Sequence, residues 1–452
     1  MKAINPATDE LIKEYREHTP DEISDIIGQV HEEYLKWRET DFAYRARLMF
    51  RAAEILRKNV DRYARTISME MGKIITEARA EVEKSAWVCD FYAENAEKFL
   101  ADEIIETDAG KSFVAFQPLG VVLAVMPWNF PFWQVIRFAA PALMAGNAGV
   151  LKHASNVPGS ALAIEEMFHE AGFPEHIFRT LLVSSRLVEG IITDDRVKAV
   201  TLTGSEPAGS SVASIAGREL KKTVLELGGS DPFIVLEDAD LPACVATSAT
   251  ARMINAGQSC IAAKRFIVVE PMVRRFEEQQ VAIMKSLKVG DPLDEKNQVG
   301  PLARMDLLEE LDTQVQKSIQ MGAKLLCGGK RADRPGAFYE PTVLSEVKKG
   351  MPAYGEETFG PVSAIIPVKD TEAAIAVAND SEFGLGGSVW SRDTGKAEEV
   401  ARRIETGAVF VNGLTKSDPR LPFGGIKKSG YGRELSHYGI KEFVNIKTIW
   451  IK

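Results

Sequence analysis

The stretch that decides the fold lies in the middle of the chain: Val197-Lys198-Ala199-Val200-Thr201-Leu202-Thr203-Gly204-Ser205-Glu206. Its apolar first part predicts a buried strand, Gly204 allows a tight turn, and a helix is predicted to begin just after Ser205. The unbonded N–H groups and the positive dipole end of such a helix can hold an anion such as a pyrophosphate. The glycines do not form the GxGxxG pattern, so a plain turn in which Ser205 caps the helix explains the stretch equally well.

Strands and helices alternate on both sides of this stretch. Upstream, residues 121–125 and 149–152 are strand-like and residues 159–171 are helical, and downstream 222–227 is a further strand. This alternation is typical of a parallel sheet with crossover helices. It restarts after Gly228-Gly229, with strands predicted at 232–236, 264–269, 324–327, 362–368 and 410–412 and a helix at 241–255. We therefore expect an α/β protein with two successive α/β units, preceded by helices between residues 21 and 99.

Length and composition narrow the class of protein. The chain has 452 residues, which is about three domains at roughly 150 residues each. Its 45% hydrophobic and 26% charged residues exclude intrinsic disorder. A net charge of −9 argues against a nucleic-acid binder, which needs a basic face for phosphates. A local positive pocket for a small anion remains compatible with that charge.

The apolar segment 121–151 and the cysteines indicate whether the protein spans a membrane and which compartment it occupies. The segment carries Arg137 and three prolines, so it does not predict a spanning helix, and the first residues lack the apolar core of a signal peptide. The four cysteines, Cys89, Cys244, Cys260 and Cys327, form no CxxC pair and no Cys/His cluster. We expect no metal site, no membrane partner and a reducing, cytoplasmic compartment.

Three motifs carry side chains suited to chemistry, and each is ambiguous alone. Asn129, between Pro127 and Pro131, is either a rigid amide donor or the cap of a kink. Glu226, at a strand end beside two glycines, is either near a ligand or a structural, salt-bridged carboxylate. Cys260 follows the flexible Gly257, so it is either an exposed, activated thiol or an inert structural cysteine.

Together the motifs resemble one family, the aldehyde dehydrogenases, over essentially the whole chain. The motifs are Asn5-Pro6-Ala7-Thr8, Pro127-Trp128-Asn129-Phe130-Pro131, Thr203-Gly204-Ser205, Glu226-Leu227-Gly228-Gly229, Gly257-Gln258-Ser259-Cys260, Glu357-Thr358-Phe359-Gly360-Pro361 and Pro422-Phe423-Gly424-Gly425. The resemblance implies a Rossmann-like cofactor domain, an α/β catalytic domain and a small β oligomerisation arm. The corresponding residues are 1–102 with 121–228, 229–428, and 103–120 with 429–452. A homodimer or homotetramer is implied as well.

The resemblance also implies a chemistry. Cys260 looks like the nucleophile that attacks the aldehyde carbon. The Asn129 amide and the Cys260 backbone N–H would hold the oxyanion, and collapse of the adduct would send hydride to a nicotinamide. Glu226 looks like the base that activates water to hydrolyse the thioester, and burial could raise its pKa toward neutrality.

The implied cofactor residues contain one departure from the family pattern. By resemblance, the cofactor would contact a set of residues near the motifs: Trp128, Lys152, Gly204, Ser205, Leu227, Glu357 and Phe359. After the lysine the family often has Pro-x-Glu, whose carboxylate binds both ribose hydroxyls and would repel a 2′-phosphate. This chain has His153-Ala154-Ser155 instead, so we expect NADP in preference to NAD, with Ser155 donating to the phosphate and Lys152 and His153 assisting.

Two residues indicate the substrate. Arg137 in an apolar run needs a partner, either a structural carboxylate or a substrate carboxylate. In the succinate-semialdehyde dehydrogenase branch of the family, an Arg and a Ser at the places of Arg137 and Ser417 bind the distal carboxylate. A second Arg of some members is replaced here by Ile254, with Arg252 two residues earlier. We expect a small aldehyde, succinate semialdehyde, as the substrate.

Several alternatives share these motifs. Glutarate semialdehyde or a broader range of medium-chain aldehydes would suit the same residues. An acylating enzyme that uses coenzyme A is disfavoured by Glu226, which such relatives often lack. A cysteine hydrolase or thioesterase needs a histidine partner, and no histidine lies in a motif. A non-catalytic descendant would not be expected to keep Cys260, Glu226 and Asn129 together.

Overall fold

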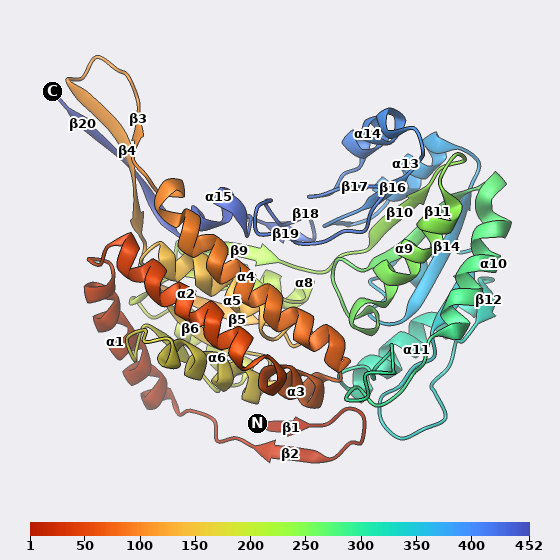
Figure 1. The fold of residues 1–452 in the computed structure, drawn as a ribbon, viewed down its shortest axis with the longest axis horizontal. Coiled ribbons are helices and arrows are strands. Elements are labelled where there is room, and N and C mark those ends of the chain that lie inside the picture. The colour runs from red at the N-terminus through yellow and green to blue at the C-terminus, as the bar shows by residue number, and fades with distance from the viewer.

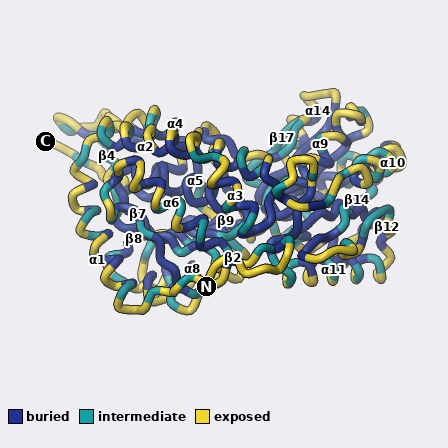
Figure 2. Tube along the Cα trace, turned by 60° about the horizontal axis from the view of Figure 1, so that its bottom comes forward, coloured by how far each residue is buried: buried dark blue, intermediate teal, exposed yellow.

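The computed structural model describes residues 1–452 and consists of two α/β units side by side with a projecting arm (Figure 1). Each unit has its own apolar core, one of 74 and one of 46 buried residues. The buried stretches of chain run through the middle of both units, while the C-terminal end is exposed (Figure 2). The predicted α/β fold class is confirmed. No helix in the structure combines the length and the apolar character needed to cross a bilayer.

The first unit is built on a six-stranded sheet in the spatial order β19-β9-β8-β5-β6-β7. Its strands are β5 (Val121–Met126), β6 (Ala148–His153), β7 (Phe178–Thr180), β8 (Val197–Thr203), β9 (Lys222–Glu226) and β19 (Gly430–Tyr431). All neighbours pair in parallel except β19, which is antiparallel to β9. The central strand β5 is apolar throughout because helices cover both of its faces.

Helices surround this sheet, as the alternating pattern predicts. They are α1 (Pro20–Trp37), α2 (Phe42–Lys58), α3 (Val60–Met71), α4 (Ile75–Phe99), α5 (Trp133–Met144), α6 (Pro158–Glu170), α7 (Val188–Ile192), α8 (Glu206–Arg218) and α15 (Ser436–Ile440). A capping box of Thr19 and Glu22 fixes the start of α1. Every residue of α5 is buried, which explains the apolar run that contains Arg137. A small hairpin, β1 (Lys2–Ile4) with β2 (Leu11–Glu14), precedes them.

The strand order reverses beside β5, and this reversal positions a binding site. From β5 the chain proceeds outward to β6 and β7 on one side, and β8 and β9 lie on the other. Ligands of open α/β sheets bind at the carboxyl ends of the strands at such a reversal. The segments at this point are Trp128-Asn129 after β5 and Gly204-Ser205 after β8.

The second unit is built on a seven-stranded sheet in the order β12-β13-β14-β11-β10-β16-β17. Its strands are β10 (Asp231–Val235), β11 (Ala263–Val269), β12 (Lys324–Cys327), β13 (Thr342–Ser345), β14 (Val362–Val368), β16 (Ser388–Trp390) and β17 (Phe410–Val411). Its helices are α9 (Leu241–Met253), α10 (Glu270–Ser286), α11 (Met305–Gln320), α12 (Pro352–Gly355), α13 (Thr371–Asn379) and α14 (Thr394–Arg403). The chain passes from the end of β9 to the start of β10 in four residues, so the carboxyl edge of the first sheet faces the amino edge of the second.

The arm consists of three strands in the order β20-β4-β3. Strand β20 (Val444–Ile451) pairs along the length of β4 (Lys111–Pro118), and β3 (Glu103–Ile104) pairs with the other edge of β4. The two segments predicted to form an arm therefore pair with each other. Residues 430–440 instead belong to the first unit, through β19 and α15, so the arm's second segment begins later than residue 429.

Candidate active site

Two cavities meet at Cys260. The cavity on the first-sheet side has a volume of about 610 Å³ and is lined by residues that include Trp128, Ser205 and Glu357. The other has a volume of about 240 Å³, is more apolar, and is lined by residues that include Trp133, Arg137 and Ser417. Only Cys260 and Gln134 line both cavities. A thiol in this place can contact ligands from either side.

The turn that carries Cys260 has an unusual backbone. Helix α9 ends at Met253, two residues earlier than predicted, because Asn255 and Ala256 adopt left-handed conformations with φ of 54° and 53°. Gly257 follows with φ 79°, and a side chain there would collide with the Gly360 carbonyl. Such strain persists only where the surrounding structure holds it, and it is common at functional sites.

Two buried cations hold this turn through its carbonyl oxygens. Arg252 Nη2 donates to Gly257 O at 2.6 Å. Lys264 Nζ donates to the carbonyls of Ser259, Cys260 and Ala262 at 3.0, 2.8 and 3.2 Å, and lies 3.4 Å from Glu357 Oε1. Arg252 lines neither cavity, so it positions the turn and does not face a substrate.

The environment of Cys260 keeps its thiol protonated in this state. Burial raises the pKa of Cys260 to about 12, and the positive Lys264 opposes part of that rise. The backbone N–H of Cys260 donates to no backbone carbonyl, so it is free to bind an oxyanion.

Asn129 lines the larger cavity together with Cys260, and hydrogen bonds fix the orientation of its amide. Gln134 Nε2 donates to Asn129 Oδ1 at 3.1 Å, and Asn129 Nδ2 donates to Gln258 O at 3.1 Å. The amide nitrogen has two N–H groups, so one is left for another acceptor. The amide of Asn129 and the N–H of Cys260 therefore each have a free donor, and both residues line the larger cavity.

A buried ion pair fixes the segment that carries Asn129. Lys73 Nζ pairs with Glu81 and donates to Asn129 O at 2.9 Å. Glu81 Oε1 accepts from the N–H groups of Phe132 and Trp133 at 2.8 and 3.1 Å. Removing either charge would leave the other buried and unpaired, which is strongly destabilising.

The carboxyl group of Glu226 is buried and lines neither cavity. Neither of its oxygens has a hydrogen-bond partner, and burial together with the nearby Glu434 raises its pKa well above the ordinary value. A side chain on Gly424 would come within 2.6 Å of Glu226 Oε1, so the glycine makes room for this carboxyl. Glu226 is therefore closed off from both cavities in this structure.

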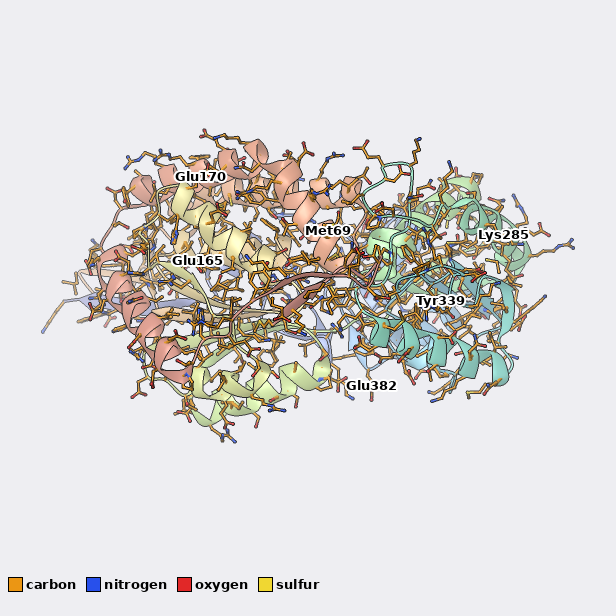
Figure 3. All side chains as sticks on the ribbon, turned by 90° about the horizontal axis from the view of Figure 1, so that it is seen from below. Met69, Glu165, Glu170, Lys285, Tyr339 and Glu382 are labelled. Carbon is orange, nitrogen blue, oxygen red and sulfur yellow. The ribbon has the colours of Figure 1, made fainter.

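The larger cavity brings together most residues predicted to contact a cofactor. Trp128, Gly204, Ser205, Leu227, Glu357 and Phe359 all line it. Ser205 is the N-cap residue of α8, as one of the two explanations predicted, but its side chain makes no capping hydrogen bond, so the hydroxyl is available. Glu357 Oε1 accepts from the Gly229 N–H at 3.0 Å, which fixes its carboxylate at the cavity wall. Glu382 lines the same cavity and lies between the ends of α8 and α11 (Figure 3).

Lys152 and Ser155 lie outside this cavity, at the end of β6 and in the turn that follows. Ser155 is exposed and Lys152 is half-buried. The expectation that His153 assists them is wrong. His153 Nε2 lies 3.0 Å from Pro131 O, its Nδ1 accepts from Ala154 N–H, and burial lowers its pKa to about 4, so it is neutral and occupied.

The smaller cavity contains Arg137 and Ser417, with one difference from the prediction. Arg137 forms a buried ion pair with Glu434, and its guanidinium lies 4.8 Å from the centre of the Phe423 ring. Of the two partners predicted for Arg137, the structure therefore shows the carboxylate that belongs to the protein itself. Ser417 Oγ accepts from Lys84 Nζ at 2.7 Å. Ile254 lines this cavity in the place of the family's second arginine.

Sequence reasoning missed Lys73, Glu81, Lys84, Gln134 and Lys264. A charged residue on the apolar stripe of a helix is a usable signal, and Glu81 lies on such a stripe with Ala78, Val82 and Ser85. Lys264 lies inside an otherwise apolar strand, where a buried charge needs partners. Lys84 carried no comparable signal because its helix position is half-exposed.

Comparisons with known proteins agree with this geometry. A protein of Synechocystis named probable succinate-semialdehyde dehydrogenase [NADP(+)] is 54% identical, over 100% of this chain and 99% of its own. Succinate-semialdehyde dehydrogenase [NADP(+)] 1 of Mycobacterium bovis is 52% identical with the same coverage. The crystal structure of succinic semialdehyde dehydrogenase from Streptococcus pyogenes in complex with NADP+ superposes with a TM-score of 0.98 at 43% identity, over 100% of this chain and 99% of that one. Residues 1–449 match the aldehyde dehydrogenase family, and the chain belongs to that family.

Proposed function

We propose that this protein oxidises succinate semialdehyde to succinate with NADP in preference to NAD. The observation that carries the proposal is the meeting of two unlike cavities at one cysteine. One cavity lies at the strand-order reversal beside the start of α8, and the other is apolar with cationic side chains. The similar proteins from Synechocystis and Mycobacterium bovis have names that specify this substrate and cofactor.

The residues of the larger cavity fit a dinucleotide. Ser205 and the start of α8 would bind the pyrophosphate, Glu357 the nicotinamide ribose, and Trp128, Leu227 and Phe359 would pack near the ring. Lys152 and Ser155 would bind the adenosine ribose, where Ser155 can donate to a 2′-phosphate that a glutamate would repel. When bound, the nicotinamide supplies the hydride acceptor.

In the proposed reaction the Cys260 thiol first loses its proton to water, and the resulting thiolate attacks the aldehyde carbon, so that the carbonyl oxygen becomes an oxyanion. Asn129 Nδ2 and the Cys260 N–H stabilise that charge. Collapse of the oxyanion with loss of hydride leaves a thioester on Cys260. Glu226, after rotating toward Cys260, takes a proton from water, and the water oxygen attacks the thioester and releases the acid and the thiolate. No histidine lines either cavity, so a cysteine hydrolase with a Cys–His pair is not favoured.

We propose further that the carboxylate end of the substrate lies in the smaller cavity near Ser417 and Arg137. The cofactor domain would comprise residues 1–102 and 121–228 and the catalytic domain 229–428. The arm would join subunits of a homodimer or homotetramer, because Ile446 and Trp450 on β20 are exposed at 62% and 50%. A cytoplasmic location would keep Cys260 reduced.

The test is an aldehyde panel run with NAD and NADP in parallel, followed by the absorbance of the reduced cofactor. The panel contains succinate semialdehyde, glutarate semialdehyde and butanal. We expect the highest kcat/KM for succinate semialdehyde with NADP. A higher value for butanal would contradict the substrate, a higher value with NAD would contradict the cofactor, and no reduced cofactor with any aldehyde would contradict the reaction.

A further inference from the structure

The smaller cavity contains an amino group that has no counter-charge. Lys84, on α4 of the first unit, lines the cavity opposite the loop at residues 414–417 of the second unit. Its Nζ donates to Ser417 Oγ at 2.7 Å and lies 4.3 Å from the centre of the Trp133 ring. Neither partner is an anion. A half-buried cation between two such groups has a free position for a negative ligand.

The other charged groups around this cavity have partners in the protein, apart from the exposed Lys416. Glu81 pairs with Lys73, and Arg137 pairs with Glu434. Glu77 Oε2 accepts from the Asn255 N–H at 2.9 Å. Asp418, just outside the cavity, is bound by Arg420 at 2.7 Å. Lys84 is thus the half-buried cation of this cavity that forms no ion pair.

The electrostatics of Lys84 agree with an unfilled anion position. Burial, together with repulsion by Arg137, lowers the pKa of Lys84 to about 8, although the more distant carboxylates of Asp418 and Glu81 oppose part of that fall. A carboxylate bound at the amino group would offset both effects, because an opposite charge favours the protonated form.

Lys84 and Ser417 present donors to one point in the cavity. An ammonium has three N–H donors, and only one is used for Ser417. Because Ser417 Oγ accepts that hydrogen bond, its own O–H remains free to donate. A carboxylate placed between the two would receive one charge-assisted hydrogen bond from lysine and one from serine.

We propose that Lys84, with Ser417, binds the distal carboxylate of the substrate and is the main determinant of the preference for ω-carboxy aldehydes over neutral ones. Arg137 then has a secondary role, because its guanidinium already forms an ion pair with Glu434. The proposal rests on the function proposed above. It adds a residue from the first unit to a site that resemblance alone would assign to Arg137 and Ser417.

The first experiment measures KM and kcat for succinate semialdehyde and butanal in the full-length protein and in Lys84→Met, Lys84→Arg and Lys416→Met. Lys416 is the matched control, an exposed cation on the rim of the same cavity. Lys84→Met should raise KM for succinate semialdehyde about 10- to 100-fold, the loss expected for a hydrogen bond to a charged group. Its effect on butanal should be far smaller. Lys84→Arg should recover much of the loss, and Lys416→Met should change KM less than about threefold.

Equal changes for both aldehydes in Lys84→Met, or no change, would overturn the proposal. A second measurement, the inhibition of butanal oxidation by succinate, tests the role of Lys84 independently of the proposed function. The wild-type protein should be inhibited, and Lys84→Met should need at least tenfold more succinate. If succinate semialdehyde is a poor substrate of the wild type, the proposed function fails, and the succinate measurement still decides on Lys84. Equal inhibition of both proteins, or no inhibition of the wild type, would refute the role of Lys84.

Discussion

The two cavities that meet at Cys260 are built in different ways. The larger cavity takes much of its wall from turns that directly follow strands, such as Trp128 after β5 and Ser205 after β8. The smaller cavity takes its wall from helices α4 and α5 and from a loop of the other unit. The first is made by local chain reversals, and the second by packing of distant segments.

This difference explains which residues were foreseen. A strand end followed by glycine and a helix start has a local sequence pattern, and the residues of the larger cavity follow it. Lys84 and Ser417 are 333 positions apart, and nothing local to either one indicates the other. Arg137 stood out as a charge in an apolar run, but its partner Glu434 lies in a distant segment.

The largest effect should come from Cys260, the cysteine that lines both cavities. Cys260→Ala should lower aldehyde oxidation by at least about 10⁴-fold, because no covalent intermediate can form. Formation of NADPH measures the loss, and binding of NADP by calorimetry should persist. Cys327→Ala is the control, since Cys327 lines neither cavity and should keep full activity. Substantial turnover by Cys260→Ala would contradict the mechanism.

The second largest effect is expected for Glu226, which lines neither cavity in this structure. Glu226→Gln should lower steady-state turnover by about 10²–10⁴-fold, the range for loss of a general base. The first turnover should still produce a burst of NADPH, and intact-mass spectrometry should detect the thioester. Since the pKa of Glu226 is raised, the fraction of ionised base grows with pH, so the wild-type hydrolysis rate should rise from acid toward alkaline pH. A variant with an unchanged steady-state rate would rule Glu226 out.

A third prediction tests whether Arg137 stabilises the protein through Glu434 or binds the substrate. Arg137→Met leaves Glu434 buried without its cation, so the free energy of unfolding should fall by about 3–5 kcal/mol. A lower melting temperature measures this change. The double variant Arg137→Met/Glu434→Gln should recover part of it, because the buried charge is removed. An unchanged melting temperature with a selective rise in KM for succinate semialdehyde would show instead that Arg137 is free for the substrate.

The smallest effect concerns Ser155, which lies outside the larger cavity in the turn after β6. Ser155→Glu should lower kcat/KM with NADP by about 10- to 100-fold, since a carboxylate repels the 2′-phosphate and the serine hydrogen bond is lost. The value with NAD should change little or improve. Ser286→Glu, on the exposed face of α10, adds the same charge elsewhere and serves as control. Equal losses with both cofactors would show that Ser155 does not select between them.

Much of the fold was predictable because its signals are local. The strands at 121–126, 197–203 and 222–226 and helix α6 were predicted to within a residue or two at each end. The end of α9 was not, since Asn255 and Ala256 adopt left-handed conformations that only the packing around the Cys260 turn maintains. The arm was predicted as two strands, but their pairing with each other came from the structure.

The sequence by itself determined the family, the α/β class and the identity of the candidate nucleophile, amide donor and base, because each lies in a short motif at a turn. Only the tertiary structure decided the charge pairing. It joined Arg137 to Glu434, Lys73 to Glu81 and Lys84 to Ser417, and it buried Glu226 outside both cavities. The physical reason is that periodicity and turn chemistry act over a few residues. The partner of a buried charge is chosen by whatever the fold brings within hydrogen-bonding distance.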